Sequence, residues 1–205
     1  IKYIYNTNKK SHIRNGENIA MLCIMRHGKT DWNELHKLQG HTDIPLNANG
    51  IAMAENAAKE YKNVHFDVCY CSPLTRARQT ADIILRDRDE KVPVIIDDRL
   101  IEMCFGEYEG IQGYTDDAGY NVNTLFHNPA GYIPDKGAES LDELFARTGE
   151  FLDTIIKPEL AKGKDILIVG HGAMNSSIIC QVRGKSYEHF WDEAIENCKL
   201  KCLIS

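Results

Sequence analysis

Residues 22–28, LCIMRHG, and residues 166–172, ILIVGHG, decide the fold of this chain. In each stretch a short apolar run leads into a His-Gly pair and a helical pattern follows, which predicts a buried parallel strand of a βα unit. Ligands of parallel sheets bind beyond the carboxyl ends of the strands. We therefore expect His27 and His171 at the ligand-binding edge of one sheet.

The glycine that follows each histidine supports this interpretation. Gly28 and Gly172 have no Cβ, so we expect the backbone there to approach a ligand closely. A single His-Gly after a strand can be only a turn, but two such pairs favour a site.

The remaining patterns alternate between strands and helices. We predict strands at 66–71 and 94–96, an antiparallel edge strand at 199–203, and helices after Asn47, at 73–86, at 140–158 and from about 174. In the second helix Ser72 is the expected N-cap and Pro73 the first helical residue, and Pro158 is expected to end or kink the third. The alternation predicts an α/β fold, a three-layer α/β/α sandwich with a mostly parallel central sheet.

Residues 103–139 break this alternation. Six glycines and two prolines interrupt the stretch, and no helical or strand period is sustained. A long irregular excursion in a compact domain is usually functional. We therefore predict a lid insertion at about 103–139.

Composition limits the function classes. The 205 residues fit one domain, and the formal net charge of −6 argues against a nucleic-acid or membrane-surface partner. No apolar run approaches the ~20 residues of a membrane span, and residues 1–20 lack the apolar core of a signal peptide. These features predict a cytoplasmic protein; the oligomeric state is not readable.

The N-terminal segment and the cysteines lead to two further predictions. Residues 1–20 are polar and basic, and we interpret them as an appended segment, of a kind that expression vectors supply, before a single domain at 21–205. The seven cysteines are odd in number, form no CxxC pair and lie largely in apolar patterns. They are predicted to be reduced core residues.

Five side chains at the predicted strand ends suit a phosphoryl group. Arg26 and Arg76 offer planar forks of donors for phosphate oxygens, and Arg76 lies near a helix N-terminus that also favours anions. Neighbouring cations are expected to keep His27 neutral and therefore nucleophilic, while His171 donates to the same phosphate. The alternatives are a surface arginine at position 76 and a core or capping histidine at 171.

A leaving alkoxide needs a proton, and Glu102 is the candidate donor. A bound phosphate, with about −1.5 to −2 charges, favours the protonated form of a nearby carboxyl, so Glu102 is expected to act chiefly when substrate is present. The alternative is a solvated loop carboxylate, like Glu107 or Glu109.

Four ordered blocks of sequence resemble the histidine phosphatase superfamily, in its phosphoglycerate mutase-like branch. They are Arg26-His27-Gly28 with Thr30, Trp32, Asn33 and Gln39-Gly40; Ser72-Pro73-Leu74 with Arg76; Glu102 with Gly106 and Glu109-Gly110; and His171-Gly172. The resemblance implies a phosphoglycerate mutase-like fold and a nucleophilic His27 that is phosphorylated. It also implies a phosphate pocket of Arg26, Arg76 and His171, with Glu102 as proton donor. Asn33, Gln39, Gly40 and Gly172 are then the candidate substrate-binding residues.

The chain departs from the family's pattern at several points. Lys29 stands where the family often has Glu or Gln, Gly170 replaces a common Ser, and Ala173 replaces the Asn that mutases have after the second His-Gly. Family mutases also carry an arginine pair in the insertion, where this chain is acidic. These departures leave the substrate open and favour hydrolysis over transfer.

We therefore predict a metal-independent phosphatase that hydrolyses a phosphomonoester of a small metabolite through a phosphohistidine and needs no cofactor. The alternative within the family is a cofactor-dependent phosphoglycerate mutase. Outside it, a phosphate-binding module without turnover and a zinc site of His27, Glu102 and His171 are the competitors. The zinc site lacks an HxxxH spacing, and the two arginines would repel a dication.

Overall fold

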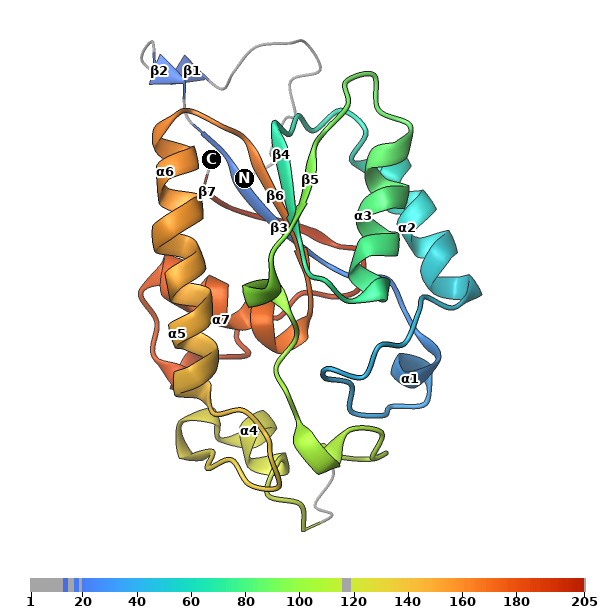
Figure 1. Cartoon of the computed structure of the whole chain (residues 1–205), viewed down its shortest axis with the longest axis vertical. Coiled ribbons are helices and arrows are strands. Elements are labelled where there is room, and N and C mark those ends of the chain that lie inside the picture. The colour runs from blue at the N-terminus through green and yellow to red at the C-terminus, as the bar shows by residue number, and fades with distance from the viewer. Residues whose placement is uncertain (1–12, 15–16, 19, 116–118, 205) are drawn as a thin grey trace.

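A five-stranded sheet forms the centre of the molecule (Figure 1). The computed structural model describes residues 13–14, 17–18, 20–115 and 119–204. The strands are β3 (Leu22–Arg26), β4 (Val68–Cys71), β5 (Val94–Ile96), β6 (Ile166–Gly170) and β7 (Leu200–Ile204), in the order β5-β4-β6-β3-β7. β7 runs antiparallel to β3, and the other neighbours pair in parallel. The mostly parallel sheet is therefore confirmed.

Helices cover both faces of this sheet. The α-helices are α1 (Asp31–Glu34), α2 (Ala48–Glu60), α3 (Thr75–Arg86), α4 (Asn123–His127), α5 (Leu141–Phe151), α6 (Lys157–Ala161) and α7 (Gly172–Arg183). Short helical turns are η1 (Asp98–Leu100), η2 (Gly106–Tyr108), η3 (Pro129–Gly131) and η5 (Tyr187–His189), and η4 (Leu152–Ile156) is a π-helix. In Figure 1, α2 and α3 lie on one side of the sheet and α5, α6 and α7 on the other. The predicted three-layer sandwich is confirmed.

Alternating side chains divide the core into two layers. In β3, Leu22 and Ile24 join the core under α5 and α7, whereas Cys23 and Met25 join the core under α2 and α3. β6 and β4 alternate in the same way. Because successive side chains of a strand point to opposite faces, a strand buried on both faces reads as a continuous apolar run.

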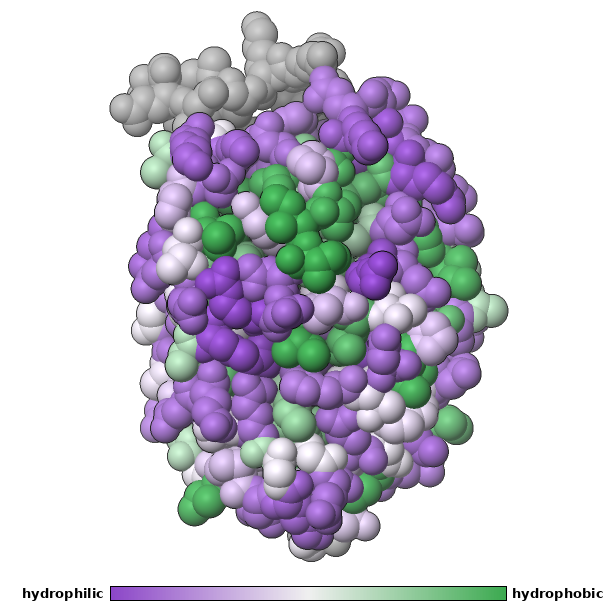
Figure 2. All heavy atoms as spheres, in the orientation of Figure 1, coloured by the Kyte–Doolittle hydropathy of each residue, from purple (hydrophilic) through white to green (hydrophobic). Residues whose placement is uncertain are grey.

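The edge strand β5 differs from the interior strands. Val94, Ile95 and Ile96 are all exposed, by 43%, 45% and 45%. Figure 2 shows an apolar patch over this part of the sheet. The predicted strand 94–96 is thus present, but its outer side has no covering helix among the described residues.

Helix α3 begins at Thr75, two residues after the predicted start at Pro73. The N-cap position is Leu74 rather than Ser72, whose Oγ accepts from the backbone N–H of Leu74 at 3.3 Å and lies 2.6 Å from Nε2 of His171. Asp43 takes over this task from another segment: its carboxylate accepts from the backbone N–H of Thr75 at 2.8 Å and from its hydroxyl at 2.7 Å. A cap supplied by tertiary structure is not visible in the local sequence.

Pro158 does not end its helix, contrary to one predicted outcome. α5, the π-helix η4 and α6 follow one another without a break, and α6 extends to Ala161. The hydrogen-bond spacing changes before the proline, which lies in the first turn of α6, where its missing N–H is tolerated. The capping box of Ser140 and Glu143 at the start of α5 is present as predicted.

The prediction of seven reduced cysteines is wrong for one pair. Cys23 and Cys202 form a disulfide between β3 and β7, whose register places them opposite each other with Cα atoms 4.0 Å apart. Their sequence separation of 179 hides this proximity in the sequence. The other five cysteines are free.

The described part of residues 103–139 packs against the body. Val122 and Leu125 are buried in the same core as α5 and α7. Phe126 stacks on Trp191, with ring centroids 5.4 Å apart, and the Trp191 indole donates to the carbonyl of Leu125 at 2.8 Å. This packing fixes one side of the segment; its opening and closing as a lid remains a prediction.

Two expectations concern regions outside the sheet. β1 (Ile13–Arg14) and β2 (Glu17–Asn18) pair as an antiparallel ribbon, and most of the segment 1–20 lies outside the described residues, so its appended origin stays a prediction. Among the described residues, every helix is too short or too polar to cross a membrane.

Candidate active site

The two predicted His-Gly strand ends lie side by side. β3 and β6 pair in parallel with Arg26 opposite Gly170, and the backbone N–H of His27 donates to the carbonyl of Gly170 at 2.9 Å. The next residues are therefore neighbours, and the rings of His27 and His171 have centroids 5.1 Å apart. Strand register alone brings together two histidines separated by more than half of the chain.

The geometry of His27 leaves one ring nitrogen available. Its Nδ1 lies 2.6 Å from the carbonyl oxygen of Gly28, and because a carbonyl only accepts, Nδ1 carries the proton and donates. Burial, then the positive charges of Arg76 and Arg26, hold the pKa of His27 well below its ordinary value. The ring is therefore neutral near pH 7, with its lone pair on Nε2.

His171 is fully buried at the start of α7. Its Nε2 lies 2.6 Å from Oγ of Ser72, and its Nδ1 has no partner among the described residues. Burial is the largest cause of a pKa well below the ordinary value, followed by the charge of Arg76. This environment leaves a buried polar atom beside His27 that a ligand could satisfy.

Arg76 is completely buried, which excludes a surface arginine. Its Nη1 donates to the carbonyl of Thr42 at 3.0 Å and its Nη2 to the carbonyl of Gly40 at 2.8 Å. Burial lowers its pKa to about 10, against the opposing effect of the Glu102 charge, so the guanidinium stays protonated.

Arg26 stands at the end of β3 with one weak partner. Its Nη1 donates to the carbonyl of Ile195 at 3.4 Å. Nε of Arg26 and Nε of Arg76 are buried donors without partners in the described residues. Buried donors that lack acceptors are typical of a site whose acceptor is a ligand.

Glu102 reaches the N-terminus of α7. Its Oε2 accepts from the N–H groups of Gly172 at 2.8 Å and Ala173 at 3.2 Å, and its Oε1 accepts from those of Met174 at 2.9 Å and Met103 at 2.8 Å. The residue is buried, so the solvated alternative is wrong. Capture of the carboxylate also explains why α7 begins at Gly172, slightly before the predicted start.

The four candidate substrate-binding residues differ in their contacts. Gln39 is buried, with Oε1 accepting from the Thr30 hydroxyl at 2.8 Å and Nε2 left without a partner in the described residues. Asn33 uses its Oδ1 in the capping box of α1, accepting from the Thr30 backbone at 3.0 Å. The Gly40 carbonyl holds Arg76.

The two glycines of the strand ends have different surroundings. A Cβ on Gly172 would lie 3.5 Å from Oε2 of Glu102 and 3.7 Å from the guanidinium carbon of Arg26, inside the site. A Cβ on Gly28 would lie 2.6 Å from the carbonyl oxygen of Gly50. The glycine at 28 is therefore required for packing against α2, and the close approach of a ligand there stays a prediction.

Sequence reasoning missed three supporting residues. Ser72 contacts His171, and Arg147 donates to the backbone carbonyl of Glu102 at 3.2 Å. Glu109, taken above as an example of a solvated carboxylate, accepts from the backbones of His41 at 2.8 Å, Thr42 at 2.7 Å and Phe105 at 3.3 Å and from the Thr42 hydroxyl. For Glu109, the available signal in the sequence was its place in the Glu109-Gly110 block of the family resemblance.

Comparisons with known proteins agree with this geometry. The profile described as histidine phosphatase superfamily (branch 1) matches residues 22–204. A 2,3-bisphosphoglycerate-dependent phosphoglycerate mutase 2 of Gloeobacter violaceus is 34% identical over 88% of this chain and 83% of its own length. The uncharacterized phosphatase PhoE of Bacillus subtilis is 34% identical over 81% of this chain and 79% of its own.

Solved structures share the whole architecture. The phosphoserine phosphatase of Entamoeba histolytica, in complex with 3-phosphoglyceric acid, superposes with a TM-score of 0.74 at 29% identity and covers 89% of both chains. The profile match includes both His-Gly strand ends, the Arg76 block and the Glu102 block. The chain therefore belongs to branch 1 of the histidine phosphatase superfamily.

Proposed function

We propose that this protein is a metal-independent phosphomonoesterase that acts on a small phosphorylated metabolite through a phosphohistidine at His27. The observation that carries the proposal is the state of this histidine: a neutral ring whose Nδ1 donates to the carbonyl of Gly28 and whose Nε2 has no hydrogen bond within the described residues, with a pKa lowered by burial, Arg76 and Arg26. A neutral imidazole beside fixed cations is a competent nucleophile toward a phosphoryl group.

The reaction follows from the positions of the side chains. The unpartnered donors of Arg26 and Arg76, together with His171, bind the phosphoryl oxygens. Nε2 of His27 forms a bond to phosphorus while the bond from phosphorus to the ester oxygen breaks, and Glu102 gives its proton to that oxygen. Water then attacks phosphorus, the bond from phosphorus to Nε2 of His27 breaks, Glu102 takes a proton from this water, and phosphate leaves.

Glu102 in this structure accepts from backbone N–H groups of α7. Such a helix N-terminus also favours phosphate. We propose that substrate phosphate takes these donors and releases the carboxyl, which then turns toward the leaving group. This exchange would make Glu102 an acid chiefly when substrate is bound.

The charge of residues 103–140 favours hydrolysis over transfer. This stretch contains six acids, and Lys136 is its one Lys or Arg. The Lys136 ammonium lies over the Tyr108 ring, 4.9 Å from its centroid, rather than free for a second phosphate. An acidic segment repels a bis-phosphorylated glycerate, which a mutase must retain and rebind.

Incubation with 3-phosphoglycerate should therefore release inorganic phosphate without accumulating 2-phosphoglycerate, and 2,3-bisphosphoglycerate should not stimulate the reaction. Both products can be followed by phosphorus NMR in one experiment, with a known mutase run in parallel. If 2,3-bisphosphoglycerate were required and the two phosphoglycerates were interconverted faster than phosphate is released, the alternative function, a phosphoglycerate mutase, would be established instead.

The substrate class is proposed from the same family. A similar enzyme of Entamoeba histolytica is a phosphoserine phosphatase, and another, of Shigella flexneri, is an alpha-ribazole phosphatase. A panel of phosphorylated amino acids, glycerates and nucleoside analogues, assayed with purified protein, would identify the preferred ester. A cytoplasmic location and the absence of a cofactor are parts of this proposal.

Exhaustive chelation should leave phosphatase activity unchanged, because two arginines already supply positive charge to the phosphate and His171 can donate a hydrogen bond to it. In the described residues, His27, Glu102 and His171 do not form a group with metal-ligand spacing; His65, Asp67 and Asp165 do, and none of them belongs to the proposed site. The measurement is kcat/KM before and after dialysis against a chelator, with a zinc-dependent phosphatase as positive control. Activity that disappears and returns with Zn²⁺ or Mg²⁺ would support the metal alternative.

A further inference from the structure

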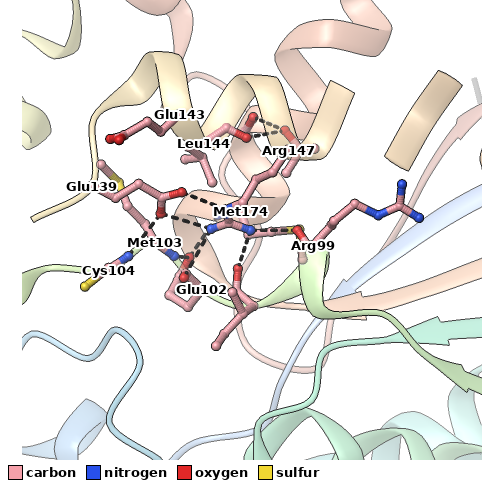
Figure 3. A network of polar contacts seen from close by, with 12 residues as sticks. Arg99, Glu102, Met103, Cys104, Glu139, Glu143, Leu144, Arg147 and Met174 are labelled. Atoms are coloured by element: carbon pink, nitrogen blue, oxygen red, sulfur yellow. Dashed lines mark hydrogen bonds and ion pairs between the residues drawn. The ribbon is translucent and has the colours of Figure 1, made fainter. Parts of the chain in front are cut away.

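The ion pair of Glu139 and Arg147 binds the backbone on both sides of Glu102, the proposed general acid (Figure 3). Arg147 comes from α5 and binds Glu139 through Nε at 2.6 Å and Nη2 at 3.0 Å. Its Nη1 donates to the carbonyls of Arg99 at 2.6 Å and Ile101 at 2.8 Å, and its Nη2 donates to that of Glu102 at 3.2 Å. All five donor groups of a guanidinium lie in one plane, so one side chain can hold several carbonyls.

The same ion pair also holds the other side of Glu102. Oε2 of Glu139 accepts from the backbone N–H of Cys104 at 3.1 Å. Nε2 of His41 adds a second donor to the Glu102 carbonyl at 2.9 Å. The backbone is thus fixed before and after Glu102 by partners that do not touch its carboxyl group.

This support matters because the backbone has no regular structure there. Residues 102–105 belong to no helix or strand. Side-chain contacts therefore hold this segment alongside one backbone bond, from the N–H of Glu139 to the carbonyl of Cys104 at 2.8 Å. A misplacement of about 1 Å at a reacting group can lower a rate by about 100-fold.

We propose that Arg147 is a positioning residue that aims the Glu102 carboxyl at the leaving-group oxygen. The inference rests on the proposed function, in which Glu102 donates its proton to that oxygen as the phosphorus–oxygen bond breaks. Arg147 itself touches neither the substrate nor the reacting atoms. Its contribution should therefore scale with the need of the leaving group for a proton.

The test compares Arg147→Lys with wild type on two substrates that differ in leaving group. With an alkyl phosphate, whose alkoxide must be protonated, kcat/KM should fall about 10- to 100-fold. With p-nitrophenyl phosphate, whose phenolate leaves unprotonated, it should fall less than about threefold. The substitution keeps the charge, and the ion pair borders a surface hollow of about 340 Å³ that lets a lysine reach water.

Arg99→Lys is the matched control. The Arg99 side chain binds Asp97, Glu150 and Thr154 and makes no hydrogen bond to Glu102 in the described residues. This variant should change both substrates equally and by less than about threefold. Thermal unfolding of each variant shows whether it is folded at the assay temperature; if Arg147→Lys is not, Glu139→Gln takes its place, with the same pattern expected.

Glu102→Gln separates failure of this inference from failure of the proposed function. If Glu102→Gln slows both substrates equally, the acid role itself is wrong. If it selectively slows the alkyl phosphate, but Arg147→Lys slows both substrates equally, the acid role stands and the positioning role is wrong. In the double variant, Arg147→Lys should add less than about threefold to the effect of Glu102→Gln; an undiminished effect would show that Arg147 acts independently of Glu102.

Discussion

His27→Ala is expected to lower turnover by at least about 10⁴-fold, because it removes the atom that forms the bond to phosphorus. Wild-type protein given ³²P-labelled substrate and quenched rapidly should retain label that is lost in acid and kept in base, as expected for a phosphohistidine. The alanine variant should retain none. Its fold should persist, since His27 contributes one short bond to its own neighbour, Gly28.

His65→Ala is the control for this experiment, because His65 is an exposed histidine that contacts two other surface residues, Asp67 and Glu90. Its label and turnover should equal those of wild type. Acid-stable label, or an active His27→Ala variant, would contradict the covalent mechanism.

Because burial and the two arginines lower the pKa of His27, the nucleophile is neutral at pH 7 and stays so as the pH falls below about 6.5. Activity should therefore not decline as the pH falls through about 6.5, where a histidine with an ordinary pKa becomes protonated.

Arg76→Lys is expected to lower kcat/KM by about 100- to 1,000-fold, the range found when a fixed donor to a transition-state oxygen is lost. The guanidinium bridges the carbonyls of Gly40 and Thr42 and still has an unpartnered buried Nε for a ligand. A lysine keeps one charge but cannot form this planar array.

Arg78→Lys provides the matched control on the same helix, because Arg78 is exposed whereas Arg76 is fully buried. Steady-state kinetics and thermal unfolding of the two variants should show a loss of activity at position 76 only, with both proteins folded at 25 °C. An unchanged kcat/KM in Arg76→Lys would remove Arg76 from the phosphate pocket.

The sequence predicted the catalytic edge because strand ends are a local property. An apolar run and the His-Gly after it can be read directly, and parallel pairing then brings His27 and His171 together. The same holds for the capping box at Ser140, which needs only residues within one turn. Local patterns sufficed wherever the structure is itself local.

The features that were missed depend on contacts between distant residues. Asp43 caps α3 from outside the helix, and the cross-strand disulfide joins cysteines 179 residues apart. Arg147 binds backbone carbonyls, which every residue has, so its partners leave no mark in the sequence. Periodicity detects the buried face of α5 but gives no reason to single out one arginine on it.

The carboxylate at the N-terminus of α7 makes phosphate binding a competition within the molecule. An anion that arrives there must replace Glu102, so its apparent dissociation constant is the intrinsic value divided by the fraction of molecules with an open helix end. The same competition acts on the product, since Glu102 can return to the helix as inorganic phosphate departs. The side chain proposed to protonate the leaving alkoxide thus also weakens product inhibition, and one residue links the chemical step to the release of phosphate.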